Sequence, residues 1–218
     1  MQKLKDIIEG ILDLILPKDI EVIEIENLSE TDIINSIPGA NELKNDKFKA
    51  LFQYKNKISR KAIWAIKYNK NQKILNKFSS LMYEYILEEI TDEISFSNFN
   101  NPILIPIPMH ENNLKRRGYN QSELLAREIL KKDDGKNFEI SINALKKIKE
   151  TPHQSELKNK NDRLKNLKDC FCANRDIIKN RNIILIDDVI TTGTTMNEAA
   201  KTLKNAGAKK VIGFSLAH

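Results

Sequence analysis

Apolar and polar positions alternate along the chain in two distinct ways. Short runs of β-branched and aromatic residues are typical of buried strands, whereas apolar residues that recur every three or four positions are typical of amphipathic helices. The first pattern predicts strands at 20–26, 48–54, 103–107, 138–142, 145–148, 169–173, 183–186 and 211–216. The second predicts helices at 4–16, 58–68, 74–90 and 196–206, and one that begins after Asn120. Strands that alternate with helices predict an α/β fold with a parallel twisted sheet flanked by helices.

Two polar stretches interrupt this pattern, and we expect both to form loops. The first, 110–119, carries the basic cluster Lys115-Arg116-Arg117-Gly118 directly after a predicted strand. The second, 149–169, is long for a compact domain, and such loops usually act as lids or are partly ordered. A turn signal at 37–41 precedes the main alternation. We therefore expect an N-terminal extension at 1–46 and the main domain at 47–218.

Composition narrows the class of protein. The chain has 218 residues, of which 40% are hydrophobic and 30% are charged, and this suits a soluble domain with an extension. No apolar run approaches the ~20 residues of a membrane-spanning helix, and the acidic, amphipathic start is unlike a signal peptide. Two cysteines, Cys170 and Cys172, are too few for a disulfide framework or a four-ligand zinc site. We expect a cytoplasmic protein.

Positive charge is concentrated in one part of the chain. The formal net charge is +6, and residues 47–83 contain ten Lys or Arg and no Asp or Glu. Aromatic residues are interleaved with these bases. Cationic grooves with stacking rings bind single-stranded nucleic acid without reading its sequence. The alternative is a pair of helices with solvated lysines and buried aromatics, and the sequence leaves both interpretations open.

The most informative stretch is 183–195. Four apolar β-formers lead into Asp187 and Asp188, and a turn of threonines around Gly193 then opens a helix. A helix N-terminus attracts anions and glycine lets the backbone approach a ligand closely, so this turn suits a phosphate. Carboxylates accept hydrogen bonds from the vicinal hydroxyls of a ribose. The combination indicates a sugar-phosphate site, where a divalent cation would help to offset further phosphates.

Other phosphate, nucleophile and metal motifs are absent from the sequence. It contains no G-x-x-x-x-G-K-[ST], no G-x-G-x-x-G, no G-x-S-x-G and no H-E-x-x-H. The alternative to a ligand site is a helix that is simply capped after a strand. It explains neither the acid pair nor the four threonines.

The segment 184–195, Ile-Leu-Ile-Asp-Asp-Val-Ile-Thr-Thr-Gly-Thr-Thr, resembles the phosphoribosyl-pyrophosphate (PRPP) motif of type I phosphoribosyltransferases. Further peptides resemble the ComF family, the late-competence branch of this fold. They are Pro106-Ile107-Pro108-Met109-His110, Arg116 to Gln121, Leu124-Leu125-Ala126, Thr151-Pro152-His153-Gln154, Arg163 with Asn166, and Ile66-Lys67-Tyr68. The resemblance covers about 48–218 and implies a type I phosphoribosyltransferase-like fold. Many ComF members carry a cysteine-rich zinc ribbon near the N-terminus. Residues 18–45 contain no cysteine here, so we expect no zinc.

The resemblance also implies roles for individual residues. Asp187 and Asp188 would be the catalytic pair that holds the ribose hydroxyls. The PRPP-binding set would be Asp187, Asp188, Val189, Ile190, Thr191, Thr192, Gly193, Thr194 and Thr195. The pyrophosphate side would be formed by Pro108, His110, Arg116, Arg117 and Lys146 or Lys147. Thr151, Gln154 and Arg163 would belong to a lid. Mg²⁺ would arrive with PRPP and keep its waters, with no direct protein ligand.

Two functions of different classes follow from this resemblance. The first is a Mg²⁺-dependent phosphoribosyltransferase whose acceptor the sequence does not identify. The second is a non-catalytic protein that senses PRPP or a nucleotide, or that binds single-stranded DNA. The family's biological role implies action in DNA uptake during natural transformation, with the uptake machinery as a partner. No pattern indicates an oligomeric state.

Overall fold

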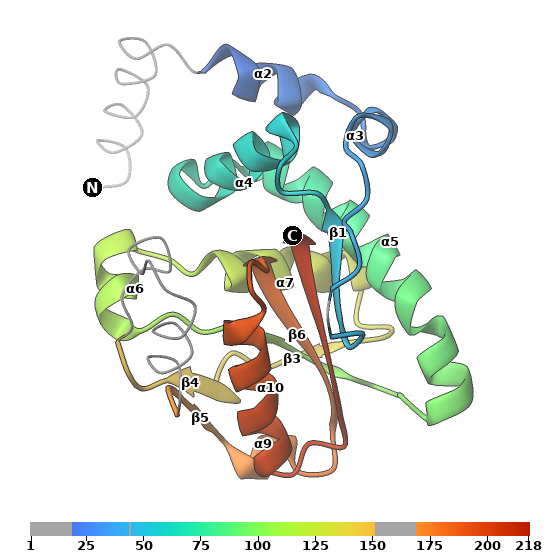
Figure 1. The fold of residues 1–218 in the computed structure, drawn as a ribbon, viewed down its shortest axis with the longest axis vertical. Coiled ribbons are helices and arrows are strands. Elements are labelled where there is room, and N and C mark those ends of the chain that lie inside the picture. The colour runs from blue at the N-terminus through green and yellow to red at the C-terminus, as the bar shows by residue number, and fades with distance from the viewer. Residues whose placement is uncertain (1–18, 44, 151–168) are drawn as a thin grey trace.

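The computed structural model describes residues 19–43, 45–150 and 169–218. Its central sheet has five parallel strands in the order β1-β7-β6-β2-β3 (Figure 1). These strands are β1 (Phe48–Phe52), β2 (Ile103–Pro106), β3 (Glu139–Ile140), β6 (Asn182–Val189) and β7 (Lys210–Ala217). The helices are α2 (Ile20–Asn27), α3 (Glu30–Ser36), α4 (Lys57–Asn69), α5 (Gln72–Ser97), α6 (Glu111–Arg117), α7 (Gln121–Asp133), α9 (Arg175–Ile178) and α10 (Thr194–Asn205). The predicted parallel α/β sheet is confirmed.

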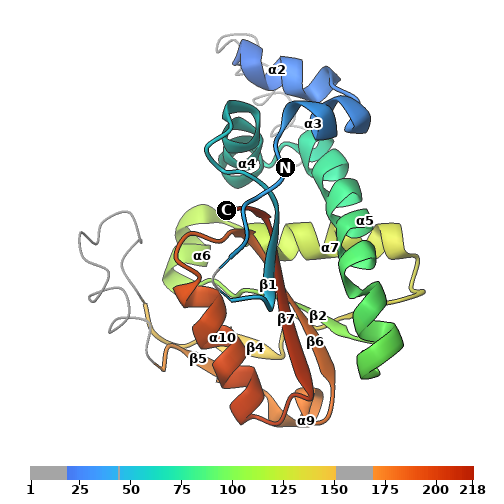
Figure 2. The same ribbon diagram turned by 45° about the vertical axis from the view of Figure 1, so that its right-hand side comes forward.

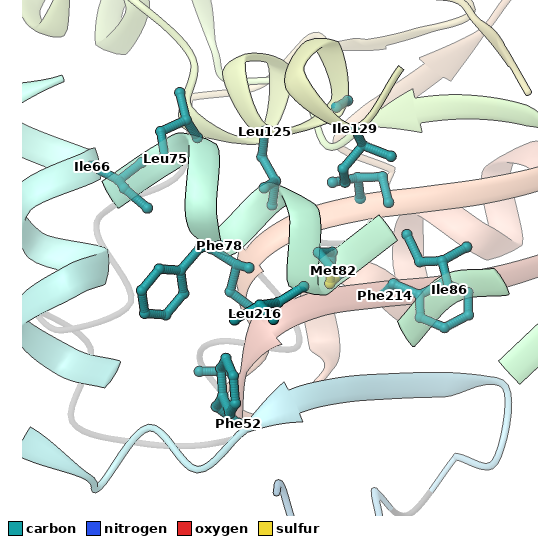
Figure 3. Close-up of a cluster of buried hydrophobic side chains, with 14 of the residues drawn as sticks. Phe52, Ile66, Leu75, Phe78, Met82, Ile86, Leu125, Ile129, Phe214 and Leu216 are labelled. Carbon is teal, nitrogen blue, oxygen red and sulfur yellow. The ribbon is translucent and has the colours of Figure 1, made fainter. Parts of the chain in front are cut away.

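Alternate residues of the central strands pack on opposite faces of the sheet. On β6, Ile184 and Ile186 join a core built with α5 and α7, whereas Ile183 and Leu185 join a core on the α10 side. All four side chains are fully buried, as expected of a parallel strand that is covered on both faces. Figure 2 shows α7 and α10 on opposite sides of the sheet. Figure 3 shows the first core, where side chains of α5 lie between those of α7 and β7.

The carboxyl ends of the strands meet at one edge of the sheet, and α4 lies next to that edge. Both views place α4 beside the end at which β6 and β7 terminate (Figures 1 and 2). Because ligands of open α/β sheets bind outside the carboxyl ends of the strands, this arrangement puts a helix from early in the chain beside the predicted site.

The predicted strand at 20–26 is wrong, because these residues form the helix α2. The Asp19 carboxylate caps the helix by accepting a hydrogen bond from the Glu21 N–H at 3.1 Å. Val22 and Ile25, three positions apart, are buried in the core that α4 and α5 also line. Ser29 and Asp32 form a capping box at the start of α3. Residues 20–37 thus share a core with the main domain, and the boundary after residue 46 stays a prediction.

The expected loop at 110–119 is also wrong, because most of it forms the helix α6. His110 Nδ1 caps the helix by accepting a hydrogen bond from the Asn112 N–H at 3.3 Å, and Gly118 ends it with a φ of +85°. No residue of α6 is buried. Because the helix packs no face into the core, its sequence needs no apolar periodicity, and the pattern that predicts helices is missing. The predicted strands near 145 and 171 exist as β4 (Leu145–Lys147) and β5 (Phe171–Ala173). They pair antiparallel in a separate two-stranded sheet.

Some predictions fall outside the described residues. These are the helix at 4–16 and most of the lid, including Thr151, Gln154 and Arg163. Within 19–43, 45–150 and 169–218, no helix combines the length and the apolar character that a membrane crossing requires.

Candidate functional site

The acid pair lies where β6 reaches the edge of the sheet. Asp187 and Asp188 follow the buried run of β6 and are themselves only partly buried. Asp187 Oδ1 accepts hydrogen bonds from Ser122 Oγ at 2.8 Å and from the Asp188 N–H at 2.9 Å. Asp188 Oδ1 accepts one from the Val189 N–H at 2.9 Å. Asp188 Oδ2 is buried and accepts no hydrogen bond from any described residue. With respect to the described residues, the pair therefore offers a buried carboxylate oxygen that accepts no hydrogen bond.

Lys67 places a positive charge opposite this oxygen. Its Nζ lies 3.5 Å from Asp188 Oδ2, farther than the roughly 2.8 Å of a charge-assisted hydrogen bond. The Asp188 carboxylate raises the pKa of Lys67. Tyr119 Oη donates to the Lys67 carbonyl at 2.9 Å, and Gln121 Nε2 donates to it at 3.3 Å. These two side chains fix the last turn of α4 beside the acid pair.

Asp187 has a strongly perturbed acidity. Burial, followed by the charge of Asp188, raises the pKa of Asp187 to about 7. The hydrogen bonds from Ser122 and from the Asp188 N–H, and the charge of Lys67, oppose this rise because each stabilises the ionised form. A carboxyl group that titrates near neutrality beside a cavity is typical of a functional site.

The turn after β6 is built around Gly193. Its φ of +72° lies in the left-handed region that favours glycine, and a Cβ there would lie 3.4 Å from Asn197 Nδ2. Gly193 is also the residue before α10, and no side chain caps this helix in the described part of the chain. The Thr192 and Thr194 hydroxyl oxygens lie 2.7 Å apart in the same turn. An uncapped helix start beside hydroxyl groups suits an anionic phosphate.

These elements surround a cavity of ≈ 360 Å³. Eight of the predicted PRPP-binding residues line it, namely Asp187, Asp188, Val189, Ile190, Thr191, Gly193, Thr194 and Thr195. Thr192 is not in the lining, although its hydroxyl contacts that of Thr194. Arg117, from the predicted pyrophosphate side, lines the same cavity, together with Tyr54, Lys67, Tyr68 and Met196.

Other residues predicted for the pyrophosphate side lie elsewhere. Pro108, His110 and Lys146 line a second cavity of ≈ 530 Å³, together with Lys147. Burial lowers the pKa of Lys147. Arg116 lines neither cavity and donates to Asn113 Oδ1 at 2.8 Å on α6. The structure thus brings Arg117 to the acid pair and separates it from the other members of this set.

Five residues of the site were absent from the predicted set: Lys67, Ser122, Tyr54, Tyr68 and Met196. Lys67 and Ser122 reach the acids from α4 and α7, far away in the sequence, and no local pattern marks such contacts. The peptide Ile66-Lys67-Tyr68, part of the family resemblance, was the one available signal.

The residues present fit a metal that is held mainly by a phosphate ligand. No group of three or more His, Cys, Asp or Glu side chains able to hold a metal occurs within 19–43, 45–150 and 169–218. Mg²⁺ commonly binds through one or two carboxylates and substrate phosphates while keeping several waters. The acid pair beside the threonine turn matches that mode of binding.

Comparison with known proteins gives consistent matches. Residues 67–217 match the family model of the phosphoribosyl transferase domain. Competence protein F of Haemophilus influenzae is 37% identical over 116 residues, which cover 52% of this chain and 49% of that protein. Competence protein ComFC of Bacillus subtilis is 37% identical over 116 residues, which cover 52% and 43%. DNA utilization protein YhgH of Escherichia coli O157:H7 is 31% identical over 108 residues, which cover 50% and 45%. The chain spans about half the length of these curated relatives.

Proposed function

Because this chain belongs to the phosphoribosyl transferase domain family, within its ComF branch, we propose that the cavity at the end of β6 binds PRPP. Asp187 and Asp188 accept hydrogen bonds from the ribose hydroxyls, and the turn 191–195 holds the 5-phosphate. The observation that best supports this proposal is that Asp188 Oδ2 is buried and accepts no hydrogen bond from the described residues. Leaving such an oxygen unsatisfied is costly, and a ribose hydroxyl removes that cost.

Two cations of the same cavity suit the pyrophosphate end of this ligand. Arg117 and Lys67 both line the cavity. When a ribose hydroxyl occupies Asp188 Oδ2, the Lys67 ammonium can turn from this carboxylate to a phosphate oxygen. Mg²⁺, when bound with PRPP, would offset the remaining negative charge.

The same arrangement serves a transfer reaction if an acceptor is present. The acceptor's electron pair forms a bond to C1 of the ribose, and the bond from C1 to the pyrophosphate oxygen breaks with its electrons leaving on pyrophosphate. Positive charge develops on the ribose in such a transition state, and the acid pair lies where it can stabilise that charge. Pyrophosphate release, measured with a panel of bases and amines, separates a transferase from a binding protein. If none of the bases and amines releases pyrophosphate, the result favours the binding protein.

The biological role that we propose is DNA uptake during natural transformation, carried out in the cytoplasm. It is supported by the names of the relatives, Competence protein F, Competence protein ComFC and DNA utilization protein YhgH.

Calorimetry tests PRPP binding directly. PRPP with Mg²⁺ is titrated into the wild type and into the double variant Asp187→Asn/Asp188→Asn. We expect saturable binding to the wild type and a loss of more than ~10-fold in the variant, because hydrogen bonds to charged groups contribute about 1.5–3 kcal/mol each. Asp176→Asn, an exposed acid of α9, is the control and should bind as the wild type does. Absence of binding to the wild type contradicts the proposal.

Single-stranded DNA is a second candidate ligand, and the exposure of Trp64 and Tyr68 on α4 favours it. The pairing of these charges argues against a continuous row of cations that could bind successive phosphates of a strand. Among the ten bases of 47–83, five form ion pairs with acids, namely Lys49, Lys57, Lys61, Lys67 and Lys73. Affinity for an oligonucleotide, measured against salt, tests this candidate. A flat salt dependence contradicts binding led by phosphates.

A further inference from the structure

The ring of His218 extends the pairing between β6 and β7 beyond the last residues of both strands. His218 follows β7 at the carboxyl edge of the sheet (Figure 1), and its Nδ1 lies 2.9 Å from the Ile190 carbonyl oxygen. Because a carbonyl oxygen can only accept a hydrogen bond, Nδ1 carries the hydrogen and donates it. The Ile190 N–H in turn donates to the Ala217 carbonyl at 2.9 Å. Both backbone groups of Ile190 are therefore bound to the end of β7.

The backbone of His218 is fixed on its other side by the segment that ends β1. Its N–H donates to the Phe52 carbonyl at 3.0 Å, and its carbonyl accepts a hydrogen bond from the Tyr54 N–H at 2.8 Å. These bonds continue the parallel ladder that joins β1 to β7. The ring is thus attached to a backbone that is held in place, and a side chain on such a rigid element can hold its own partner in one position.

Ile190 immediately precedes the turn 191–195, which we propose holds the 5-phosphate. Its side chain is only 2% exposed, and its Cγ2 atom would lie 3.9 Å from a Cβ at Gly193. In a trans peptide the carbonyl and the N–H of the next residue point in opposite directions. The bond from His218 to the Ile190 carbonyl therefore fixes the direction of the Thr191 N–H, and Thr191 lines the cavity of the acid pair.

A second side chain holds the turn at Gly193. Asn197 Nδ2 donates to the Gly193 carbonyl at 2.9 Å, and Asn197 Oδ1 accepts a hydrogen bond from Asn45 Nδ2 at 3.0 Å. Side chains from outside the turn thus bind the carbonyls of Ile190 and Gly193, so the orientation of its peptides is set by the surrounding structure.

We propose, building on the PRPP site proposed above, that His218 is a positioning residue for the turn 191–195. Its ring lies outside the lining of the cavity, so it acts through the Ile190 carbonyl. It holds the peptide between Ile190 and Thr191 in the orientation that binds the 5-phosphate before the ligand arrives. A turn that is ordered in advance loses less conformational freedom on binding, and this raises the affinity.

Two substitutions separate the hydrogen-bond donor from the ring. In His218→Asn the side-chain Nδ2–H can take the place of the ring Nδ1–H, whereas His218→Phe keeps a ring that cannot donate. Calorimetry with PRPP and Mg²⁺ should show an affinity about 2- to 12-fold lower in His218→Phe, the range that one hydrogen bond supplies. His218→Asn should bind nearly as the wild type does. Lys210→Met, which removes an ion pair with Glu93 at the other end of β7, is the control and should keep wild-type affinity.

Hydrogen exchange of the Ile190 amide, followed by NMR without ligand, tests the same bond independently of PRPP. Exchange should be faster in His218→Phe than in the wild type and in His218→Asn, because the neighbouring carbonyl is then no longer held.

Two calorimetric results overturn the proposal. The first is wild-type affinity for PRPP in His218→Phe. The second is an equal loss of affinity in His218→Asn and His218→Phe, because the ring and not its donor would then be what matters. If the wild type itself binds no PRPP, the PRPP site fails, and the exchange rates alone decide whether His218 holds the turn. Equal rates in the wild type and both variants remove that role as well.

Discussion

Lys67→Met tests how the acid pair keeps its charge. The substitution removes the ammonium that lies 3.5 Å from Asp188 Oδ2 and leaves an unbranched apolar side chain in its place. The two neighbouring carboxyls then lack this counter-charge, so we expect the pair to retain a proton more strongly at neutral pH. The cost of the substitution should therefore grow as the pH rises and both acids are forced to ionise.

The distance between Lys67 Nζ and Asp188 Oδ2 sets the expected loss of unfolding free energy. Unit charges 3.5 Å apart interact by about 5 kcal/mol at an effective dielectric constant of 20 and by about 1 kcal/mol in bulk water. The Lys67 and Asp188 side chains are 31% and 15% exposed, so solvent screens part of the interaction, and we expect ~1–3 kcal/mol at pH 8. Asp187 has a pKa of about 7 in the native protein, against roughly 3.9 when unfolded. At pH 5 Asp187 is therefore mostly protonated in the native protein, and the cost of the substitution should be smaller than at pH 8.

Urea denaturation of the wild type and of Lys67→Met at pH 5 and pH 8 measures both free-energy differences. Lys73→Met is a matched control, because Lys73 Nζ also lies 3.5 Å from a carboxylate oxygen, Glu26 Oε2, while its own side chain is 71% exposed. We expect the control to lose less than ~1 kcal/mol and to lose the same amount at both pH values. A loss for Lys67→Met that is independent of pH, or no larger than that of the control, refutes the reasoning.

Two further substitutions probe the site. Ser122→Ala removes the hydroxyl that donates to Asp187 Oδ1 at 2.8 Å. Since that bond favours the ionised carboxyl, thermal melts should show a loss of ~0.5–1.5 kcal/mol at pH 8 and less at pH 5; an equal loss at both contradicts this role. Gly193→Ala puts a side chain at a φ of +72°, 3.4 Å from Asn197 Nδ2, and should cost ~1–2 kcal/mol of stability. Calorimetry should also show weaker PRPP binding by Gly193→Ala, whereas wild-type affinity contradicts the role of this turn.

The part of the site that the sequence could predict is contiguous. The acids and the threonine turn follow one buried strand without a break, so strand geometry and the start of α10 fix their relation locally. The strands of the sheet were predictable for a similar reason. The apolar runs of β2, β6 and β7 are buried on both faces, and little besides a covered parallel strand explains such runs.

The rest depended on contacts that no local pattern encodes. The Ile-Glu-Val-Ile-Glu-Ile run of α2 is compatible with a strand and with a helix, and the core selects the helix by burying Val22 and Ile25 together. Helix α6 has one apolar residue, the exposed Leu114, and no apolar periodicity, so only its caps at His110 and Gly118 distinguish it from a loop. Lys67 joins the acid pair because Tyr119 and Gln121 hold its carbonyl across a large separation in sequence.

The two faces of α4 can diverge independently over evolutionary time. Its inner face is committed to the core, and its last turn is anchored to the residues that begin α7. Trp64 and Tyr68 take part in neither task. Exchange of these two side chains would change the exposed surface of α4 while it keeps the scaffold and the position of Lys67.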